Sequence, residues 1–227
     1  MRSSNIDYRE FRLSKINEPR FSHLKLLLGW VGYFVLYLLT ENLIPADKCF
    51  PVRSKLDDLI PFDEWFVIPY MGWYLLVVFS LGYFLFYNVE NFKGLQTYII
   101  VTQIIAMAMY IIFPTRQDLR PTEFPRDNVL TDLVGILYAA DTNTGVCPSL
   151  HVAYSLGIAS AWLKERSASA IAKVLVVIAV VLICLSTMFI KQHSAVDFFA
   201  ALPVCLIAEV IAFRPYYKDR KFKRMQH

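Results

Sequence analysis

The chain has 227 residues, of which 56% are hydrophobic, and its mean hydropathy is +0.44. Few soluble domains of this length are so apolar, which excludes an ordinary soluble globular protein. The formal net charge of +4 does not indicate nucleic-acid binding, because the basic residues are divided unevenly between the two predicted sides of a membrane. We therefore expect an integral membrane protein that binds no nucleic acid.

The apolar residues gather in six runs that approach the length of about 20 residues needed for a helix to cross a bilayer. The fourth run is the shortest and is rich in Ala, Gly and Ser, which suits close helix packing inside a bundle. The sequence predicts an all-α polytopic membrane protein in which residues 1–227 form a single membrane domain, with a six-transmembrane helical bundle over residues 24–213. The predicted spans are 24–44, 66–87, 95–113, 148–163, 171–190 and 194–213.

The two ends of the chain indicate how the bundle is oriented. Segment 1–23 is polar and charged and has no clear cleavage site, so we expect no cleaved signal peptide and a retained first span. Of the 23 lysines and arginines, sixteen lie on the predicted side of the cell membrane that holds both ends of the chain. The positive-inside rule places these ends in the cytoplasm. We expect the basic tail 214–227 to lie near anionic lipid headgroups.

Two long loops, 45–65 and 114–147, fall on the extracytoplasmic side in this topology. Prolines and mixed charges in the first loop indicate a structured segment at the membrane interface. In the second loop, residues 128–140 have apolar side chains at helical spacing. This pattern predicts a short amphipathic helix on the membrane surface.

The four cysteines show no spacing typical of a metal site. Cys184 and Cys205 lie within predicted spans, where packing as small apolar residues is the simplest role. Cys49 and Cys147 belong to the long loops, and a disulfide between them is a less favoured alternative to free thiols.

Ionisable side chains at the ends of membrane spans are candidates for function. In "FPTRQDLRP", residues 113–121, Arg116 and Arg120 are either solvated arginines or a guanidinium clamp for phosphate. In "CPSLH", residues 147–151, the proline suits the first turn of a helix, whose amides would point at an anion. Ser149 adds a hydroxyl donor there, and His151 is either an interfacial histidine or an acid–base group.

The third segment is "KQHSAVD", residues 191–197, at the start of the last span. His193 and Asp197 are four residues apart, so they share a helix face, and the carboxylate can hold one ring nitrogen and leave the other free. A purely structural His–Asp pair is the alternative. Lys191 adds a cation beside the pair. Three loops that carry this many cations to one membrane face favour a phosphate ligand over a metal pair, because no carboxylate cluster accompanies them.

These segments resemble the three motifs of the type 2 phosphatidic acid phosphatase superfamily, a group of membrane lipid phosphatases and phosphotransferases. The motifs are K-x6-RP, PSGH and SR-x5-H-x3-D. Arg120 and the following proline match the end of the first, residues 148–151 match the second as PSLH, and Ser186, His193 and Asp197 match the third. The PSLH variant is similar to the inositol-phosphorylceramide synthase branch, whose members transfer a phospho-headgroup.

Two motif cations are missing from this chain. Phe113 stands where the family has the lysine of its first motif, and Thr187 stands where it has the arginine of its third. We expect Arg116 and Lys191 to supply these charges instead. Leu150 replaces the glycine of the second motif.

The resemblance implies a mechanism that needs no cofactor and no metal. His193 would attack phosphorus, Asp197 would orient it, and His151 would protonate the leaving group and then activate the acceptor. The phosphate would be held by Arg116, Arg120, Lys191 and Ser149.

The leading expectation is therefore a lipid phosphatase that hydrolyses a lipid phosphate or diphosphate at the extracytoplasmic face. One alternative is a lipid phosphotransferase that moves a phospho-headgroup to another acceptor. A further alternative, from another class, is a non-catalytic phospholipid-binding or transport protein.

Overall fold

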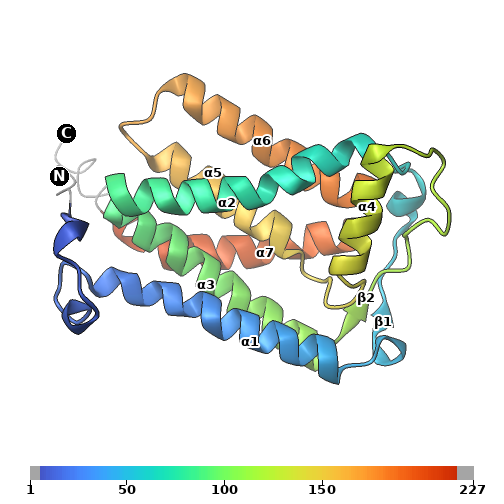
Figure 1. The fold of residues 1–227 in the computed structure, drawn as a ribbon, viewed down its shortest axis with the longest axis horizontal. Helices are drawn as coiled ribbons and strands as arrows, with labels where there is room; N and C mark the ends of the chain where they lie inside the picture. Colours follow the sequence, from blue (N-terminus) through green and yellow to red (C-terminus); the bar gives the residue numbers. More distant parts are fainter. Residues whose placement is uncertain (1–5, 219–227) are drawn as a thin grey trace.

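The computed structural model describes residues 6–218, so the ends of the predicted N-terminal segment and of the basic tail lie outside the described residues. Long helices run side by side and carry the chain back and forth along one axis (Figure 1). Short 3-10 helices occupy the N-terminal segment and the first long loop: Tyr8–Glu10, Leu13–Lys15, Ser22–Leu27, Ala46–Lys48, Lys55–Asp58 and Glu64–Phe66. The α-helices are α1 (Leu28–Leu43), α2 (Val67–Tyr87), α3 (Val89–Ile112), α4 (Val129–Ala140), α5 (Leu150–Lys164), α6 (Ala170–Phe189) and α7 (Ala195–Ala212).

Five of these helices are long and apolar enough to cross a membrane: α1 together with the preceding 3-10 turn, α2, α3, α6 and α7. This confirms the predicted all-α membrane protein. α5 forms at the position of the fourth predicted span but has only 15 residues. A helix of that length extends about 22 Å, less than the hydrocarbon core of about 30 Å. The structure therefore has five candidate spans, and the predicted count of six is not confirmed.

The helices α3 to α7 begin where short polar residues cap them. Ser149, Ser169 and Ser194 accept amide hydrogens from the first turns of α5, α6 and α7. Asn88 and Asn128 do the same for α3 and α4. Such side chains satisfy amides that have no partner within the helix. The amphipathic helix predicted over 128–140 is therefore present as α4.

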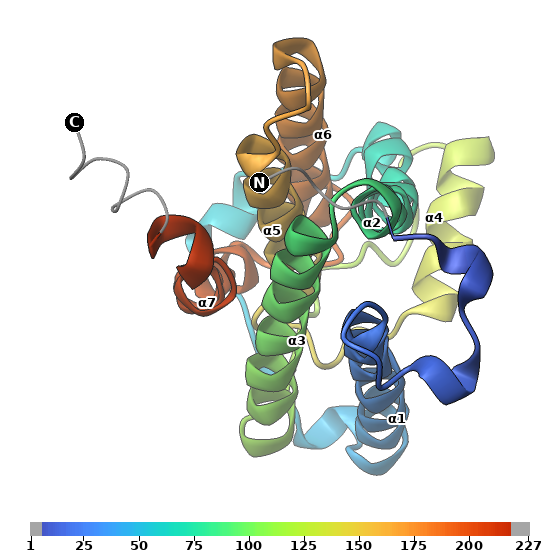
Figure 2. The same cartoon turned by 90° about the vertical axis from the view of Figure 1, so that its left-hand side faces the viewer.

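α5 is the central helix of the bundle, and it contacts α2, α3, α6 and α7. Figure 2 views the bundle along the helices, with α5 beside α3 and α6. Its small residues allow this contact. A Cβ atom on Gly157 would lie only 2.5 Å from Cδ1 of Tyr98 in α3, so the glycine lets the two backbones approach closely.

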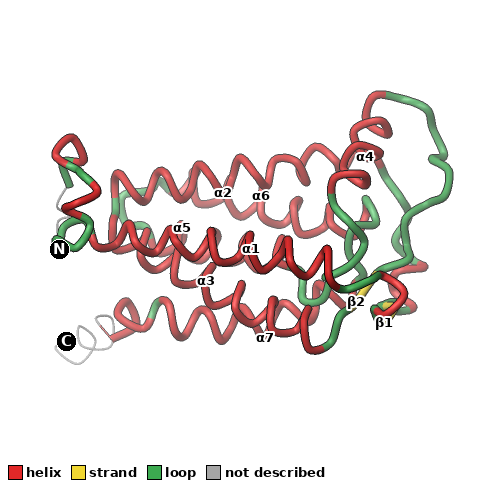
Figure 3. Tube along the Cα trace, turned by 60° about the horizontal axis from the view of Figure 1, so that its bottom comes forward, coloured by secondary structure: helices red, strands yellow, loops and turns green. Residues whose placement is uncertain are grey.

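The two long loops pair with each other at one end of the bundle. β1 (Phe50–Pro51) and β2 (Thr115–Arg116) form a short parallel pair, and Arg116 also bridges to Thr144. Figure 3 shows these strands and α4 at the end opposite to the start and finish of the described chain. This arrangement brings the three segments that resemble the family motifs to the same end of the molecule.

Candidate active site

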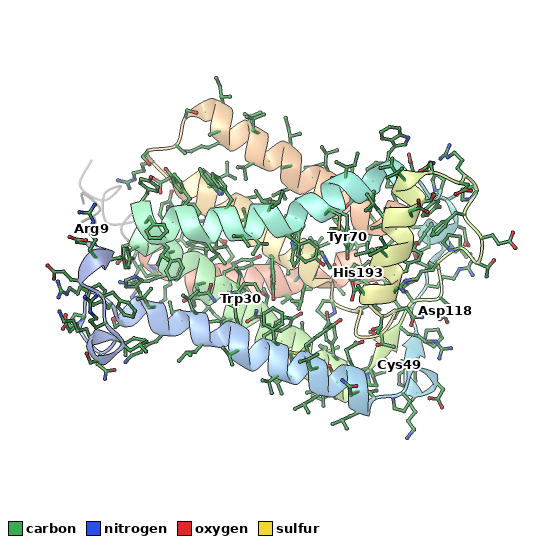
Figure 4. The ribbon with its side chains drawn as sticks, viewed as in Figure 1. Arg9, Trp30, Cys49, Tyr70, Asp118 and His193 are labelled. Atoms are coloured by element: carbon green, nitrogen blue, oxygen red, sulfur yellow. The ribbon has the colours of Figure 1, made fainter. Side chains whose placement is uncertain are left out.

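Two histidines and one carboxylate meet at this end of the bundle. Nδ1 of His193 lies 3.3 Å from Oδ2 of Asp197, and Nε2 of His193 lies 3.4 Å from Nδ1 of His151. Asp197 is fully buried and His193 is 7% exposed. Figure 4 shows His193 near the loop end of the bundle. The carboxylate therefore orients one ring nitrogen of His193, and the other nitrogen faces the second histidine.

The turn between α6 and α7 fixes the position of His193. The amides of Gln192 and His193 both donate to the carbonyl oxygen of Thr187, near the end of α6. Lys191 has a φ of 54°, the left-handed conformation that reverses the chain at this point. Oδ2 of Asp197 also accepts the amide hydrogen of Ser194 at 2.9 Å. One carboxylate oxygen thus contacts His193 and caps α7.

His151 lies in the first turn of α5, against two aromatic rings of α2. Its ring centroid is 4.6 Å from that of Tyr70 and 4.3 Å from that of Trp73. Its Nε2 atom is buried and has no hydrogen-bond partner among the described residues. Among the described residues, His193 is therefore the only hydrogen-bond partner of the His151 ring, which can donate or accept a proton.

The start of α5 is tied to α7 and α3. The amide of Ser149, a fully buried residue, donates to the backbone carbonyl of Asp197 at 3.1 Å. The hydroxyl of Tyr110 donates to the carbonyl of Pro148 at 2.7 Å. The first amides of α5 are therefore held beside both histidines, where a helix N-terminus favours an anion.

Arg120 holds the second long loop against the histidine turn. Its guanidinium donates to the carbonyl oxygens of Tyr138, Asp141 and Thr142 and to Oε1 of Gln192, the last at 2.5 Å. It also lies over the ring of Tyr138, 4.4 Å from the centroid. Burial lowers the pKa of Arg120. The Arg120 side chain thus contacts Gln192, the residue that precedes His193.

Arg116 and Lys191 contact protein oxygens away from the histidines. Arg116 donates to the carbonyl of Ala46 at 2.7 Å and pairs with Asp118 at 3.1 Å. The Nζ atom of Lys191 donates to the carbonyl oxygens of Asp57 and Ile60, and burial lowers its pKa. In this geometry neither cation replaces the missing charges beside His193.

The two substituted motif positions have structural contacts. Phe113 stacks on Phe50 with a centroid distance of 4.5 Å, which joins the two long loops. The hydroxyl of Thr187 donates to the carbonyl of Cys184 within α6. Neither side chain lines the cavity next to the histidines, which is described below.

Asp57 is a site residue that the sequence analysis missed. It is 4% exposed, and its carboxylate accepts hydrogen bonds from the Ser194 hydroxyl and the Ala195 amide, each at 2.7 Å. It also accepts the amide of Ser54 at 2.7 Å. The spacing Ser54-x-x-Asp57 is a capping-box signal, but the contact with residues almost 140 positions later has no local signature.

A cavity of about 520 Å³ begins at the histidines and extends between α1 and α2. His151, His193 and Gln192 line one part, and Trp30 and Leu81 line the part toward the other end of the bundle. Figure 4 shows Trp30 well separated from His193 along the bundle. The volume and the apolar walls are typical of a site for a small molecule or a lipid. This cavity was not predicted, because α1 and α2 form it together with the start of α5 and the turn before α7, which lie far away in the sequence.

Among residues 6–218 no group of three or more His, Cys, Asp or Glu side chains is arranged to hold a metal ion. All four cysteines are free, so the alternative disulfide between Cys49 and Cys147 is not formed. Comparisons of the chain with models of protein families, with curated proteins and with solved structures gave no match. The function is therefore argued from the geometry and from the sequence motifs.

Proposed function

We propose that this protein is an integral membrane enzyme that cleaves the phosphate ester of a lipid through a phosphohistidine on His193. The observation that carries the proposal is the position of His193 between Asp197 and His151, at 3.3 Å and 3.4 Å. A histidine that a carboxylate orients through one nitrogen, with its other nitrogen facing an acid–base histidine, is arranged for nucleophilic catalysis. The resemblance to the type 2 phosphatidic acid phosphatase superfamily supports the same assignment.

The proposed reaction has two steps at one phosphorus atom. Nε2 of His193 attacks phosphorus, the bond from phosphorus to the lipid oxygen breaks, and His151 donates a proton to that oxygen. His151 then takes a proton from water, whose oxygen attacks the phosphohistidine, and the nitrogen–phosphorus bond breaks to release phosphate. Asp197 stabilises the positive charge on His193 during both steps. The amides at the start of α5, next to Ser149, face the charge that develops on the phosphoryl oxygens.

The proposal includes a membrane arrangement. α5 completes a six-helix bundle with the five spanning helices, both ends of the chain are cytoplasmic, and the histidines lie near the extracytoplasmic surface of the cell membrane. The cavity between α1 and α2 receives the lipid chain. The groups that act on phosphorus all come from the protein, so the reaction requires no added cofactor.

A second candidate is transfer of a phospho-headgroup to an alcohol. Within residues 6–218, no lysine or arginine lines the cavity, and Arg116 and Lys191 contact protein oxygens elsewhere. A phosphate monoester carries nearly two negative charges at neutral pH, whereas a diester carries one. The small number of cations suits the diester, which is the donor in headgroup transfer, and the PSLH segment is similar to a transferase branch.

The test uses the purified full chain in detergent with lipid phosphates, lipid diphosphates and phospholipids, in the presence of EDTA. Products are measured with and without alcohol acceptors, which separates hydrolysis from transfer. His193→Ala and His151→Ala are each expected to lower the rate by at least about 10²-fold, because general acid–base catalysis alone contributes about that much. His23→Ala, at the other end of the bundle, is the matched control and should stay active.

A labelled phosphate donor adds a direct readout of the intermediate. The wild type should carry acid-labile label on His193, and His193→Ala should carry none. Full activity of both site variants, each shown to be folded by its melting temperature, would contradict the mechanism. Lipid binding without turnover by the wild type would identify a non-catalytic binding protein instead.

A further inference from the structure

The cavity beside the histidines has an acidic polar wall. Asp141 is the one Asp or Glu among its lining residues, and no lysine or arginine accompanies it in the described part of the chain. A second carboxylate, that of Glu41, lies directly behind this wall and accepts hydrogen bonds from the hydroxyls of Thr142 and Thr144. A headgroup that carries only negative charge would face these carboxylates without a balancing cation in the wall.

Asp141 is held in a fixed position close to the reacting histidine. Its Oδ1 accepts from the hydroxyl of Tyr37 at 3.1 Å, and its Oδ2 accepts from Nε2 of Gln192 at 3.2 Å. Gln192 precedes His193 in the chain and lines the same cavity. The nearest arginine, Arg120, donates to backbone carbonyls and to Gln192 rather than to the Asp141 carboxylate.

Aromatic rings line the same cavity as this carboxylate. Tyr33 and Tyr37 of α1 line the cavity with ring centroids 5.9 Å apart, and Trp73 and Tyr74 of α2 line it with centroids 4.9 Å apart. Aromatic faces attract ammonium groups, most strongly where water is excluded. A carboxylate among several such rings is a suitable site for a lipid ammonium group.

We propose that this cavity receives a zwitterionic phospholipid, with its phosphate at His151 and His193 and its ammonium group between Asp141 and the aromatic rings. The inference rests on the proposed function and makes it more specific, since the substrate is then a phosphodiester with an ammonium-bearing headgroup. The acyl chains extend along α1 and α2 toward Trp30 and Leu81.

A panel of phospholipids with identical acyl chains tests the headgroup. Cleavage between phosphorus and the glycerol oxygen yields diacylglycerol from every member, so one product serves for choline, ethanolamine, glycerol and inositol headgroups and for phosphatidic acid. The full chain in mixed micelles should form diacylglycerol from the two zwitterionic lipids about tenfold faster than from the anionic ones. Equal or faster turnover of the anionic lipids would overturn the headgroup assignment.

Two variant pairs locate the ammonium site. Asp141→Asn removes the charge and keeps the shape, and it should lower kcat/KM for zwitterionic lipids about tenfold without lowering it for anionic ones. Asp132→Asn, on the exposed face of α4, removes the same charge outside the cavity and should have no effect. Tyr74→Leu should lower turnover of the choline lipid about threefold or more, whereas Tyr74→Phe, which keeps the ring, should not.

If Asp141→Asn does not fold, the two Tyr74 variants still test the ammonium site. Tyr74 is 44% exposed, so its replacement should not prevent folding. Different results would contradict the proposed headgroup preference and the proposed histidine mechanism. Anionic preference with activity lost in His193→Ala would leave the histidine mechanism standing and reject the ammonium site. Absence of diacylglycerol from every lipid of the panel, together with no phosphate release from lipid diphosphates, would reject the proposed function.

In that second case, binding still tests the cavity. Dihexanoyl phospholipids are titrated into the wild type and Asp141→Asn, with tryptophan fluorescence as the signal because Trp30 and Trp73 line the cavity. The wild type should bind the choline lipid more tightly than the glycerol lipid, and Asp141→Asn should lose this difference. Equal affinities in the wild type would overturn the inference.

Discussion

His193 lies in the turn between α6 and α7. The carboxylate of Asp57, which belongs to the first long loop, supports this turn. It accepts hydrogen bonds from Ser194 and Ala195, and the carbonyl oxygen of the same residue accepts one from Lys191. These three hydrogen bonds of one residue join the first long loop to the histidine turn. Asp57 does not touch the reacting atoms in this arrangement, so we assign it a positioning role.

Replacing Asp57 with Asn should lower kcat more than it changes KM. The amide nitrogen of Asn has no lone pair to accept a hydrogen bond, so at least one donor among Ser194, Ala195 and Ser54 loses its partner. The loss of a buried hydrogen bond to a charged group costs about 1–3 kcal/mol of unfolding free energy. Asp58→Asn is the matched control, because the Asp58 side chain is half-exposed and pairs with Arg53. Equal kinetics of Asp57→Asn and wild type would reject the positioning role.

The pH dependence of stability provides a second readout for Asp57. Burial by itself raises the pKa of Asp57, but hydrogen bonds from Ala195, Ser54 and Ser194 outweigh it, and the net pKa lies below the ordinary value of 3.8. A carboxyl group with a lowered pKa in the folded state stabilises the protein above its unfolded pKa. This contribution is lost as the pH falls through the folded pKa.

The difference in melting temperature between wild type and Asp57→Asn should therefore be constant from pH 7 to about pH 5 and shrink below about pH 4. Thermal unfolding in detergent at a series of pH values measures it. A difference that does not change with pH would show that the Asp57 carboxylate is not the source of the stability.

Residue by residue, the sequence predicted those contacts that depend on local spacing. His193 and Asp197 face each other because they are four positions apart at the start of a helix. The phosphate-binding role predicted for Arg116 and Lys191 depends on which loop lies beside them. In the structure both side chains donate to backbone carbonyls of the first long loop. Carbonyl groups leave no pattern in a sequence, so these contacts were not predictable.

At the scale of single elements, α5 shows how a short helix rich in small residues becomes the centre of the bundle. Small residues cost it apolar area but let α3 approach, as at Gly157 and Tyr98. The high content of small residues in this helix is visible in the sequence and predicts close packing. Its end at Lys164 and its neighbours α2, α6 and α7 depend on the packing of the whole bundle.

Gly157→Ala should lower the melting temperature of the protein. The added Cβ would lie 2.5 Å and 2.6 Å from two ring atoms of Tyr98, which is 2% exposed and has little room to move. Overpacking of this kind costs about 1–3 kcal/mol. Gly82→Ala in α2 is the matched control, since no atom lies within 4 Å of its added Cβ and alanine is the better helix former. Equal melting temperatures of the two variants would contradict the close α3–α5 contact.

Across the whole molecule, the two ends of the bundle are built differently. The end with the histidines consists of long loops joined by Arg120, Asp57 and the β1–β2 pair. The opposite end has short turns, closed by Asn88 with Glu165 and by Lys164 with Glu209. The charge distribution of the sequence indicates that the short turns are cytoplasmic, and this sidedness is a prediction that cysteine labelling can test.

Asp127→Cys and Arg166→Cys place one thiol at each end of the bundle, at exposed positions. In intact cells, a membrane-impermeant maleimide should label residue 127, in the second long loop, and should label residue 166 only after permeabilisation. Mass spectrometry separates these sites from the four native cysteines. The reverse pattern would place the histidines on the cytoplasmic face, and the lipid would then come from the inner leaflet. Labelling of both sites in sealed cells would show that the helices do not separate the two ends by a membrane.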